Sequence, residues 1–397
     1  MISVEAYRER VVALAAARTP GVETVAVEAA AGRVLAEDIT ARFAVPPFDN
    51  SAMDGFAVRA EDVAGAPVVL PVVGESAASG GSIPEVRPGS AVRVMTGGRL
   101  PPGADAVVPV ESTDQPSGAA VLPGSVRIDR AVAAGANVRR RADDLAEGAM
   151  VLRAGELIGA AAIAAAASVG HGRLEVSRRP RVAVVSTGAE LVPAGMALEP
   201  GQIPDSNSPM LAALAADAGA EVVASRRSGD DPAALAALLQ DLPEVDVIFT
   251  SGGVSAGAYE PVRQLGGTLD FCSVAMQPGK PQGCGLLDGV PLVAFPGNPV
   301  SVFVSFHVFG VPLLDALGGA FRRPARRFGL AAHGWASPSG RRQYLPVIDD
   351  GNQVRPSHVR GSGSHLIASL NLADALAIVP EEQTSVSAGE RLELMKV

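Results

Sequence analysis

The sequence has few cysteines and no long uninterrupted hydrophobic run, and each scarcity excludes a class of protein. Two cysteines, Cys272 and Cys284, are too few for a disulfide framework, so we expect two ordinary buried thiols in a reducing compartment. The longest apolar stretch, residues 300–314, is interrupted by serine, histidine, glycine and proline and falls short of the ~20 residues that cross a bilayer. We therefore expect a buried helix there, no membrane contact and a cytoplasmic protein.

Basic residues are also in deficit. Lys and Arg number 33 against 42 Asp and Glu, which gives a net charge of −9, and they form no long basic run. Duplex nucleic acid is thus excluded as a partner, because affinity for it depends on phosphate neutralisation, although a local basic pocket for a small anion stays open. The first 20 residues carry interspersed charges and predict an amphipathic helix, not a signal peptide.

Hydrophobic residues, in contrast, make up 48 % of the 397 residues, which is enough to form a sizeable core. The length predicts two to four domains. Residues 179–320 alternate apolar strand-like segments with helices, which predicts a doubly wound parallel sheet covered on both faces. The expected strands are 181–186, 221–225, 245–250 and 291–295, and the expected helices 209–218 and 232–242. Ligands of such sheets bind outside the carboxyl ends of the strands.

Two β-rich regions flank this α/β domain. Residues 41–144 hold short strands (67–73, 90–94, 106–110 and 125–128) between Gly, Pro, Ser and Asp, which predicts an inserted all-β module. Helices at 3–17 and 159–168 are expected to pair with each other in an N-terminal domain of residues 1–40 and 145–178. Residues 321–397 predict a small C-terminal β domain with strands at 343–347, 375–379 and 391–394.

The turns after the four strands of the α/β domain share one composition: small, hydroxylic or acidic residues. Any one of them is compatible with ordinary turn chemistry, but four on one edge predict a ligand site. The turn that most strongly indicates a ligand site is 250–257. Its small and hydroxylic residues would let backbone N–H groups and hydroxyls approach an anion: Ser251, Gly252, Gly253 and Ser255. It has neither the lysine of an NTPase phosphate loop nor a GxGxxG dinucleotide pattern.

Other residues would complete an anion site. Pro296-Gly297-Asn298-Pro299 suits a helix start whose positive end faces the ligand, and Lys280, between two prolines, offers a point charge. Acidic residues opposite an anion call for a bridging cation, and all-oxygen ligands favour Mg²⁺. The histidines and cysteines have no zinc-ligand spacing. The acids of this set are Glu190, Asp205, Asp230 and Asp231.

The inserted module carries acidic strings of its own. FDNSAMDGFA includes Asp54, RVMTGG includes Thr96, and GANVRRRADD ends on Asp144. An isolated acidic loop of this kind is also compatible with a surface Asx turn.

Taken in order, FDNSAMDGFA, RVMTGG, PPGADAVVPVE, GANVRRRADD, VVSTGAEL, DSN, TSGGVSAG, PGKP and FPGNPVS resemble the molybdopterin molybdenumtransferase family of the MoeA type, whose animal relative is the C-terminal domain of gephyrin. The resemblance covers essentially the whole chain. It implies a homodimeric enzyme that inserts molybdate into adenylylated molybdopterin and releases AMP in a Mg²⁺-dependent step. It also implies a cleft shared between the α/β domain of one subunit and the β module of the other, and a transient contact with molybdopterin adenylyltransferase.

The resemblance assigns roles residue by residue. Catalytic positions fall on Asp54, Thr96, Asp144, Glu190 and Asp230, of which Asp54, Glu190 and Asp230 are expected to hold the metal. Substrate-binding positions fall on Asp205, Ser206, Asn207, Ser251, Gly252, Gly253, Ser255, Lys280, Pro296, Gly297, Asn298 and Pro299.

The chain departs from the family at some positions. Ala258 stands where many members have Asp, and Ser273 and Gln277 stand where some members carry lysines thought to help hold molybdate. The cations left for molybdate are Lys280, Arg341 and Arg342. Two alternatives remain compatible with the sequence. A nucleotide pyrophosphate or amide hydrolase on the same α/β domain would not explain the FDNSAMDGFA module, and a non-catalytic scaffold would not need the acids.

Overall fold

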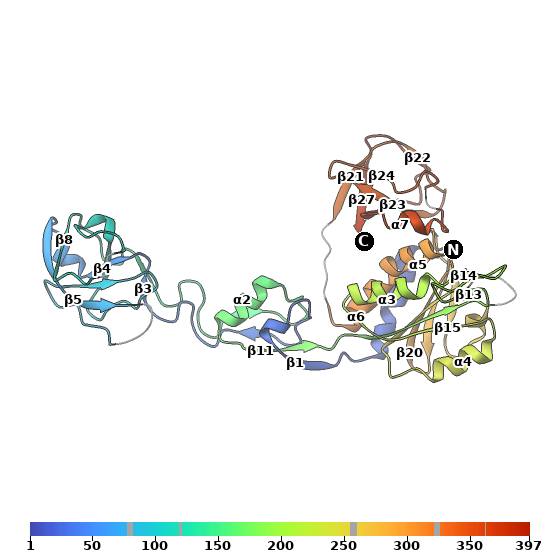
Figure 1. The fold of residues 1–397 in the computed structure, drawn as a ribbon, viewed down its shortest axis with the longest axis horizontal. Coiled ribbons are helices and arrows are strands. Elements are labelled where there is room, and N and C mark those ends of the chain that lie inside the picture. Colours follow the sequence, from blue (N-terminus) through green and yellow to red (C-terminus); the bar gives the residue numbers. More distant parts are fainter. Residues whose placement is uncertain (78–81, 119–120, 255–259, 321–325, 362) are drawn as a thin grey trace.

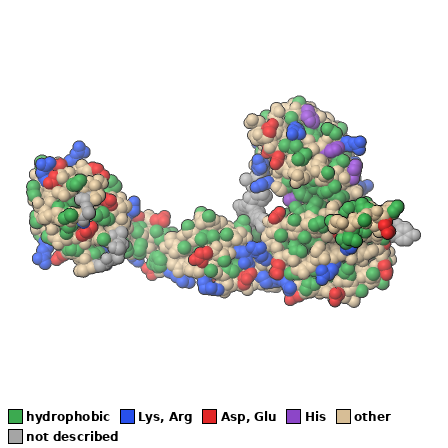
Figure 2. Space-filling model, viewed as in Figure 1, with side chains coloured by type: hydrophobic (Ala, Val, Ile, Leu, Met, Phe, Trp, Pro, Cys, Tyr) green, Lys and Arg blue, Asp and Glu red, His purple; other side chains and the backbone are tan. Residues whose placement is uncertain are grey.

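The computed structural model describes residues 1–397 except 78–81, 119–120, 255–259, 321–325 and 362. Its lobes follow one another along an extended molecule (Figure 1): the β module at one end, a small middle domain with helix α2, and the α/β domain at the other end beside the C-terminal domain. Figure 2 shows the same lobes as distinct masses with narrow junctions between them.

The α/β domain is built on a six-stranded sheet with the strand order β15-β12-β16-β20-β19-β17. Four neighbouring strands are parallel, which confirms the predicted parallel sheet: β15 (Glu221–Ser228), β12 (Arg181–Thr187), β16 (Val247–Ser251) and β20 (Val290–Phe295). Two strands extend the sheet in antiparallel fashion: β19 (Pro281–Leu287) and β17 (Asp270–Ser273). β19 was not predicted, because PQGCGLL has two glycines and no β-branched residue.

Helices cover both faces of this sheet. One face carries α1 (Val4–Ala13), α3 (Asn207–Asp217), α5 (Pro299–Ser305) and α6 (Val311–Leu317), and the other carries α4 (Pro232–Gln240) and the 3₁₀ turn η5 (Pro261–Gln264). Phe249 and Phe295 stack at 5.6 Å between ring centroids, and Phe306 meets Phe249 edge-on at 5.4 Å. By length and composition Pro299–Leu317 is one candidate to cross a membrane, but it is mostly buried in this core.

The expected pairing of helices 3–17 and 159–168 is wrong. Val4, Tyr7 and Val11 of α1 lie in the core of the α/β domain, and α1 packs on α6. The other helix, α2 (Ala160–Ser168), packs in the middle domain against β10 (Met150–Leu152). Amphipathic spacing predicts that a helix buries one face but does not say against which partner. The remaining strands of the middle domain are β1 (Val22–Ala26) paired with β11 (Arg173–Ser177), and β2 (Ile39–Thr40) paired with β10.

The β module holds a five-stranded sheet in the order β7-β4-β6-β5-β8. Four of its strands overlap the predicted ones: β5 (Val68–Ser76), β6 (Ala91–Val94), β7 (Ala106–Pro109) and β8 (Ser125–Ile128). The fifth, β4 (Gly55–Val58), was expected to belong to a loop, yet all four of its residues are buried between β6 and β7. Asp54 therefore stands directly before a central strand.

The C-terminal domain is a closed barrel. Its pairings run from β23 (Arg342–Asp349) through β24 (Gln353–Pro356), β21 (Arg327–Ala331), β27 (Arg391–Lys396) and β25 (Ala375–Val379) back to β23. A short strand from the α/β part of the chain, β18 (Met276–Gln277), pairs in parallel with β23. The barrel is thus hydrogen-bonded to the segment that precedes Lys280.

Candidate functional site

A cavity of about 580 Å³ lies at the carboxyl ends of β12 and β20, where the barrel meets the α/β domain. It brings together predicted residues from distant parts of the sequence and others outside the predicted substrate set, among them Arg341 and Ser364 of the barrel domain. The predicted residues that line it are Glu190, Asp205, Ser206, Asn207, Lys280, Pro296, Gly297, Asn298 and Pro299.

The glycine loop after β16 lies directly behind this cavity. Gly252 and Gly253 have φ of 88° and 69°, a region that side chains rarely adopt. A Cβ on Gly252 would lie 2.6 Å from the Thr187 carbonyl oxygen, and a Cβ on Gly297 would lie 3.6 Å from the Gly252 Cα. The Ser251 hydroxyl is buried and has no hydrogen-bond partner in the described chain. Ser255 falls outside the described residues.

Asp205 is fully engaged within the protein. Its Oδ1 accepts from the backbone N–H groups of Asn207 (3.1 Å) and Ser208 (3.0 Å) at the start of α3, and its Oδ2 accepts from the hydroxyls of Ser186 and Ser208, each at 2.6 Å. The side chain of Ser206, the N-cap residue, makes no capping bond. Asp205 therefore holds the start of α3 and leaves neither carboxylate oxygen without a donor.

Asn207 connects two walls of the cavity. Its Nδ2 donates to the Gly297 carbonyl at 2.7 Å, which ties the start of α3 to the turn after β20. Its Oδ1 is buried and has no partner among the described residues. A buried acceptor of this kind fits a donor on a ligand.

The start of α5 is less open than the sequence predicts. Pro299 has no N–H, and the N–H of Val300 donates to the Ser364 carbonyl at 3.1 Å. The Nδ2 of Asn298 donates to the Ser364 hydroxyl at 3.0 Å. The Ser364 loop of the barrel domain thus accepts the backbone N–H of Val300, a donor that the sequence predicts would face an anion. No local pattern marks Ser364, because its contacts are 64 and 66 positions away in sequence.

Two cations reach the cavity. Lys280 is exposed and Arg341 half-buried, and neither forms an ion pair with any residue that the structure describes. Arg342 is instead paired with Glu5 and with Glu381, the latter at 3.0 Å. Of the two positions where some family members carry lysine, Gln277 lines the cavity and Ser273 does not. The charge available to an oxyanion is therefore that of Lys280 and Arg341.

The two acids at the strand ends differ in position. Glu190 lines the cavity and folds its carboxylate over Gly188, where a Cβ would lie 2.7 Å from Oε2. Asp230 follows β15 and is exposed outside the cavity lining. Neither accepts a hydrogen bond within the described ranges, and these ranges hold no cluster of three or more metal-ligating side chains.

The predicted residues of the β module lie in another lobe. Asp54 Oδ1 accepts from the backbone N–H (2.6 Å) and the hydroxyl (2.7 Å) of Thr96, and these bonds, the backbone one first, hold the pKa of Asp54 below its usual value. Asp144 is exposed on a separate loop, where its N–H donates to the Val45 carbonyl. Figure 1 places this module at the opposite end of the molecule from the α/β domain, whose residues line the cavity, so one chain does not bring the five predicted catalytic residues together.

Three family models match consecutive parts of the chain. They are described as the MoeA N-terminal region, domains I and II (residues 2–170), a probable molybdopterin-binding domain (183–316) and the MoeA C-terminal region, domain IV (329–397).

Curated relatives and solved structures agree with these models. The chain is 43 % identical over 386 residues to molybdopterin molybdenumtransferase 2 of Mycobacterium tuberculosis, covering 94 % of each chain. It is 36 % identical over 424 residues to molybdopterin molybdenumtransferase 1 of that organism, covering 98 % of this chain and 97 % of the relative. A crystal structure of a molybdopterin biosynthesis MoeA protein from Pyrococcus horikoshii superposes with a TM-score of 0.81 at 33 % identity, covering 98 % of both chains.

Proposed function

The chain belongs to the MoeA-type family of molybdopterin molybdenumtransferases, and on that premise we propose that it inserts molybdate into adenylylated molybdopterin with release of AMP in a Mg²⁺-dependent step. It is a transferase of molybdenum cofactor biosynthesis. The observation that carries the finer proposal is the cavity itself, which offers about 580 Å³, two cations (Lys280 and Arg341) and one carboxylate (Glu190) that no described residue pairs with. That combination suits a bulky polyanionic substrate beside a small oxyanion.

Within this cavity the residues divide into two roles. Lys280 and Arg341 supply positive charge for molybdate and for the phosphates of the adenylylated substrate. The buried Asn207 Oδ1 and Ser251 hydroxyl are offered to polar groups of the pterin and its phosphate, because no described residue uses them. Ser206, Ser255 and the 296–299 turn complete the proposed substrate set, while Asp205 acts through α3.

The fit of Mg²⁺ depends on a second chain. Mg²⁺ requires several oxygen ligands. Two described carboxylates line the cavity of one chain: Glu190, which accepts no hydrogen bond from a described residue, and Asp205, whose two oxygens already accept hydrogen bonds, while Asp230 lies outside the lining. We therefore propose a homodimer in which the β module of one subunit supplies Asp54, Thr96 and Asp144 to the cavity of the other. When bound, the ion would polarise the phosphoanhydride of the adenylylated substrate. A transient contact with molybdopterin adenylyltransferase and a cytoplasmic location belong to the same proposal.

AMP release tests the proposed reaction. The purified protein is incubated with adenylylated molybdopterin, molybdate and Mg²⁺, and AMP is quantified by chromatography. We expect AMP to form only when molybdate and Mg²⁺ are both present, and EDTA to stop it. Formation of AMP without molybdate would favour the hydrolase alternative, and no AMP under any condition would favour the scaffold.

A further inference from the structure

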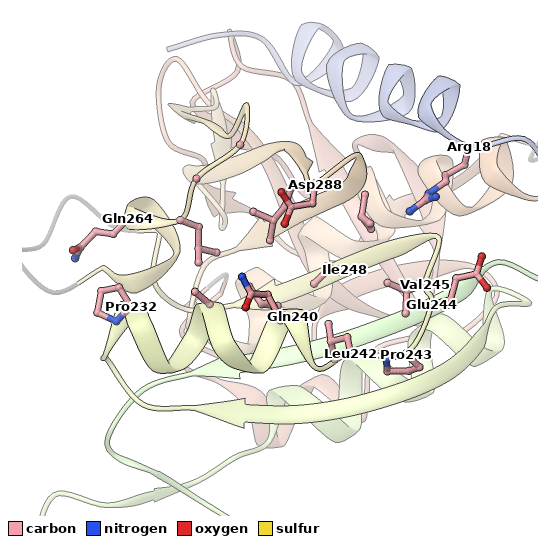
Figure 3. Close-up of a pocket in the computed structure, with 17 residues that line it drawn as sticks. Arg18, Pro232, Gln240, Leu242, Pro243, Glu244, Val245, Ile248, Gln264 and Asp288 are labelled. Carbon is pink, nitrogen blue, oxygen red and sulfur yellow. The ribbon is translucent and has the colours of Figure 1, made fainter.

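A second cavity, of about 500 Å³, lies near the opposite ends of the parallel strands, on the face covered by α4 (Figure 3). Its floor is apolar, with Leu239, Val245 and Ile248 all buried. Arg18 and Glu244 stand on one side, and Pro232 and Gln264 on the other. None of these residues belongs to the proposed substrate site.

Arg18 is the unusual side chain of this cavity. Its Nε is buried and has no hydrogen-bond partner among the described residues, and the same part of the chain provides no ion pair for its guanidinium. Nearby arginines behave differently: Arg10 pairs with Asp270 at 2.9 Å, and Arg181 lies 3.6 Å from Glu244. An N–H donor withdrawn from water without an acceptor is unfavourable, so an acceptor from a ligand would stabilise it.

Two carboxylates stand at the rim, but neither neutralises Arg18. The side chain of Glu244 is 84 % exposed and lies toward Arg181, and Asp288 is exposed in the turn between β19 and β20. Hydrated rim carboxylates are screened by solvent, whereas the Arg18 Nε is not. Among the charged side chains of the lining, half-buried Arg18 is therefore the one with a donor withdrawn from solvent.

We propose that this cavity binds a small amphiphilic anion, with an aromatic or aliphatic body on the floor formed by Leu239, Val245 and Ile248 and one carboxylate or sulfonate on Arg18. The volume is in the range of small-molecule sites. Such sites are commonly lined by apolar side chains with a few polar groups that orient the ligand. The proposal does not rest on the molybdenum transfer reaction.

The probe is 8-anilinonaphthalene-1-sulfonate, which has an aromatic body and a single anionic group. Fluorescence titration of the full chain should give saturable binding that Arg18→Gln weakens by about tenfold. Ala236→Trp, which fills the cavity from α4, should abolish that binding. Arg10→Gln, which removes an exposed charge from the preceding helix, is the matched control and should leave the affinity unchanged. The neutral analogue N-phenyl-1-naphthylamine should bind wild type and Arg18→Gln alike.

The proposal is overturned if Arg18→Gln and Arg10→Gln bind the anionic probe equally well, or if Ala236→Trp leaves its binding intact. Circular dichroism and AMP release are measured for each variant. Retained folding with loss of probe binding supports the second site, whether or not the protein releases AMP. Loss of AMP release with normal probe binding contradicts only the transferase proposal.

Discussion

The β module and the α/β domain differ in how many hydrogen bonds they give to their acidic residues. In the β module, exposed Asp54 is fixed by two hydrogen bonds from Thr96 to its Oδ1, and its Oδ2 accepts no hydrogen bond from a described residue. In the α/β domain, Asp205 is bonded on both oxygens, while Glu190 has no bonding partner in the described chain. The ability of a carboxylate to bind a ligand thus depends on how many of its oxygens already accept hydrogen bonds from its own domain.

The largest expected effect tests Asp54 and Glu190 as ligand-facing acids. Glu190→Ala and Asp54→Ala should each reduce AMP release by at least about 100-fold, because each removes charge from the reacting groups. Folding and dimerisation, followed by thermal melting and light scattering, should be unchanged. An active Glu190→Ala variant would remove that residue from the site.

A mixture of these two variants tests whether the β module of one subunit and the α/β domain of the other form one site. If the site is shared, a heterodimer of Asp54→Ala and Glu190→Ala subunits retains one intact site, so co-refolded protein should recover part of the activity. Each variant refolded alone is the control. Absence of recovery despite heterodimer formation would show that both residues act within one chain.

Gly252→Ala should have the next largest effect. Its Cβ would meet the Thr187 carbonyl, and the backbone at φ 88° resists a side chain, so the loop must shift. A displacement of this kind near reacting groups costs about 100-fold in kcat/KM. Gly229→Ala, a loop position with no atom within 4 Å of the added Cβ, should change kcat/KM little. Equal losses in the two variants would contradict the tight-loop explanation.

Asp205→Ala should affect stability more than chemistry. It removes the cap of α3 and leaves four donors without their acceptor, which we expect to lower the free energy of unfolding by about 2–4 kcal/mol. Urea denaturation measures this change, with Glu190→Ala as the control that should unfold like wild type. A wild-type unfolding curve with lost activity would make Asp205 a ligand instead.

The smallest effect concerns pH. The Thr96 bonds lower the pKa of Asp54, so the ionised form persists to lower pH than in an unbonded carboxylate. Thr96→Val removes the hydroxyl bond and should move the acidic limb of the kcat/KM profile to higher pH, whereas Thr96→Ser should restore it. An unmoved limb would mean that Asp54 ionisation does not control the rate.

Much of the fold could be predicted because its strands are rich in Val and alternate with helices, as in 181–187 and 247–251. Glycine-rich β19 and the short strand β4 lack that signal. Asp205 was predicted to bind substrate although it caps α3, since an acid before a helix fits both roles. Arg341 was one of three candidate cations, and only the contact between domains places it, and Ser364, at the cavity. Contacts between distant segments have no local pattern.

The pairing of β18 with the barrel has a mechanical consequence. Met276 pairs with Arg342 and Gln277 with Gln343, so the strand that leads into Lys280 and the strand that follows Arg341 are held in one hydrogen-bonded ladder. If the cavity widens by rotation of the barrel, Lys280 and Arg341 travel together and keep their spacing. The positive field presented to an incoming oxyanion would then be independent of the angle between the domains.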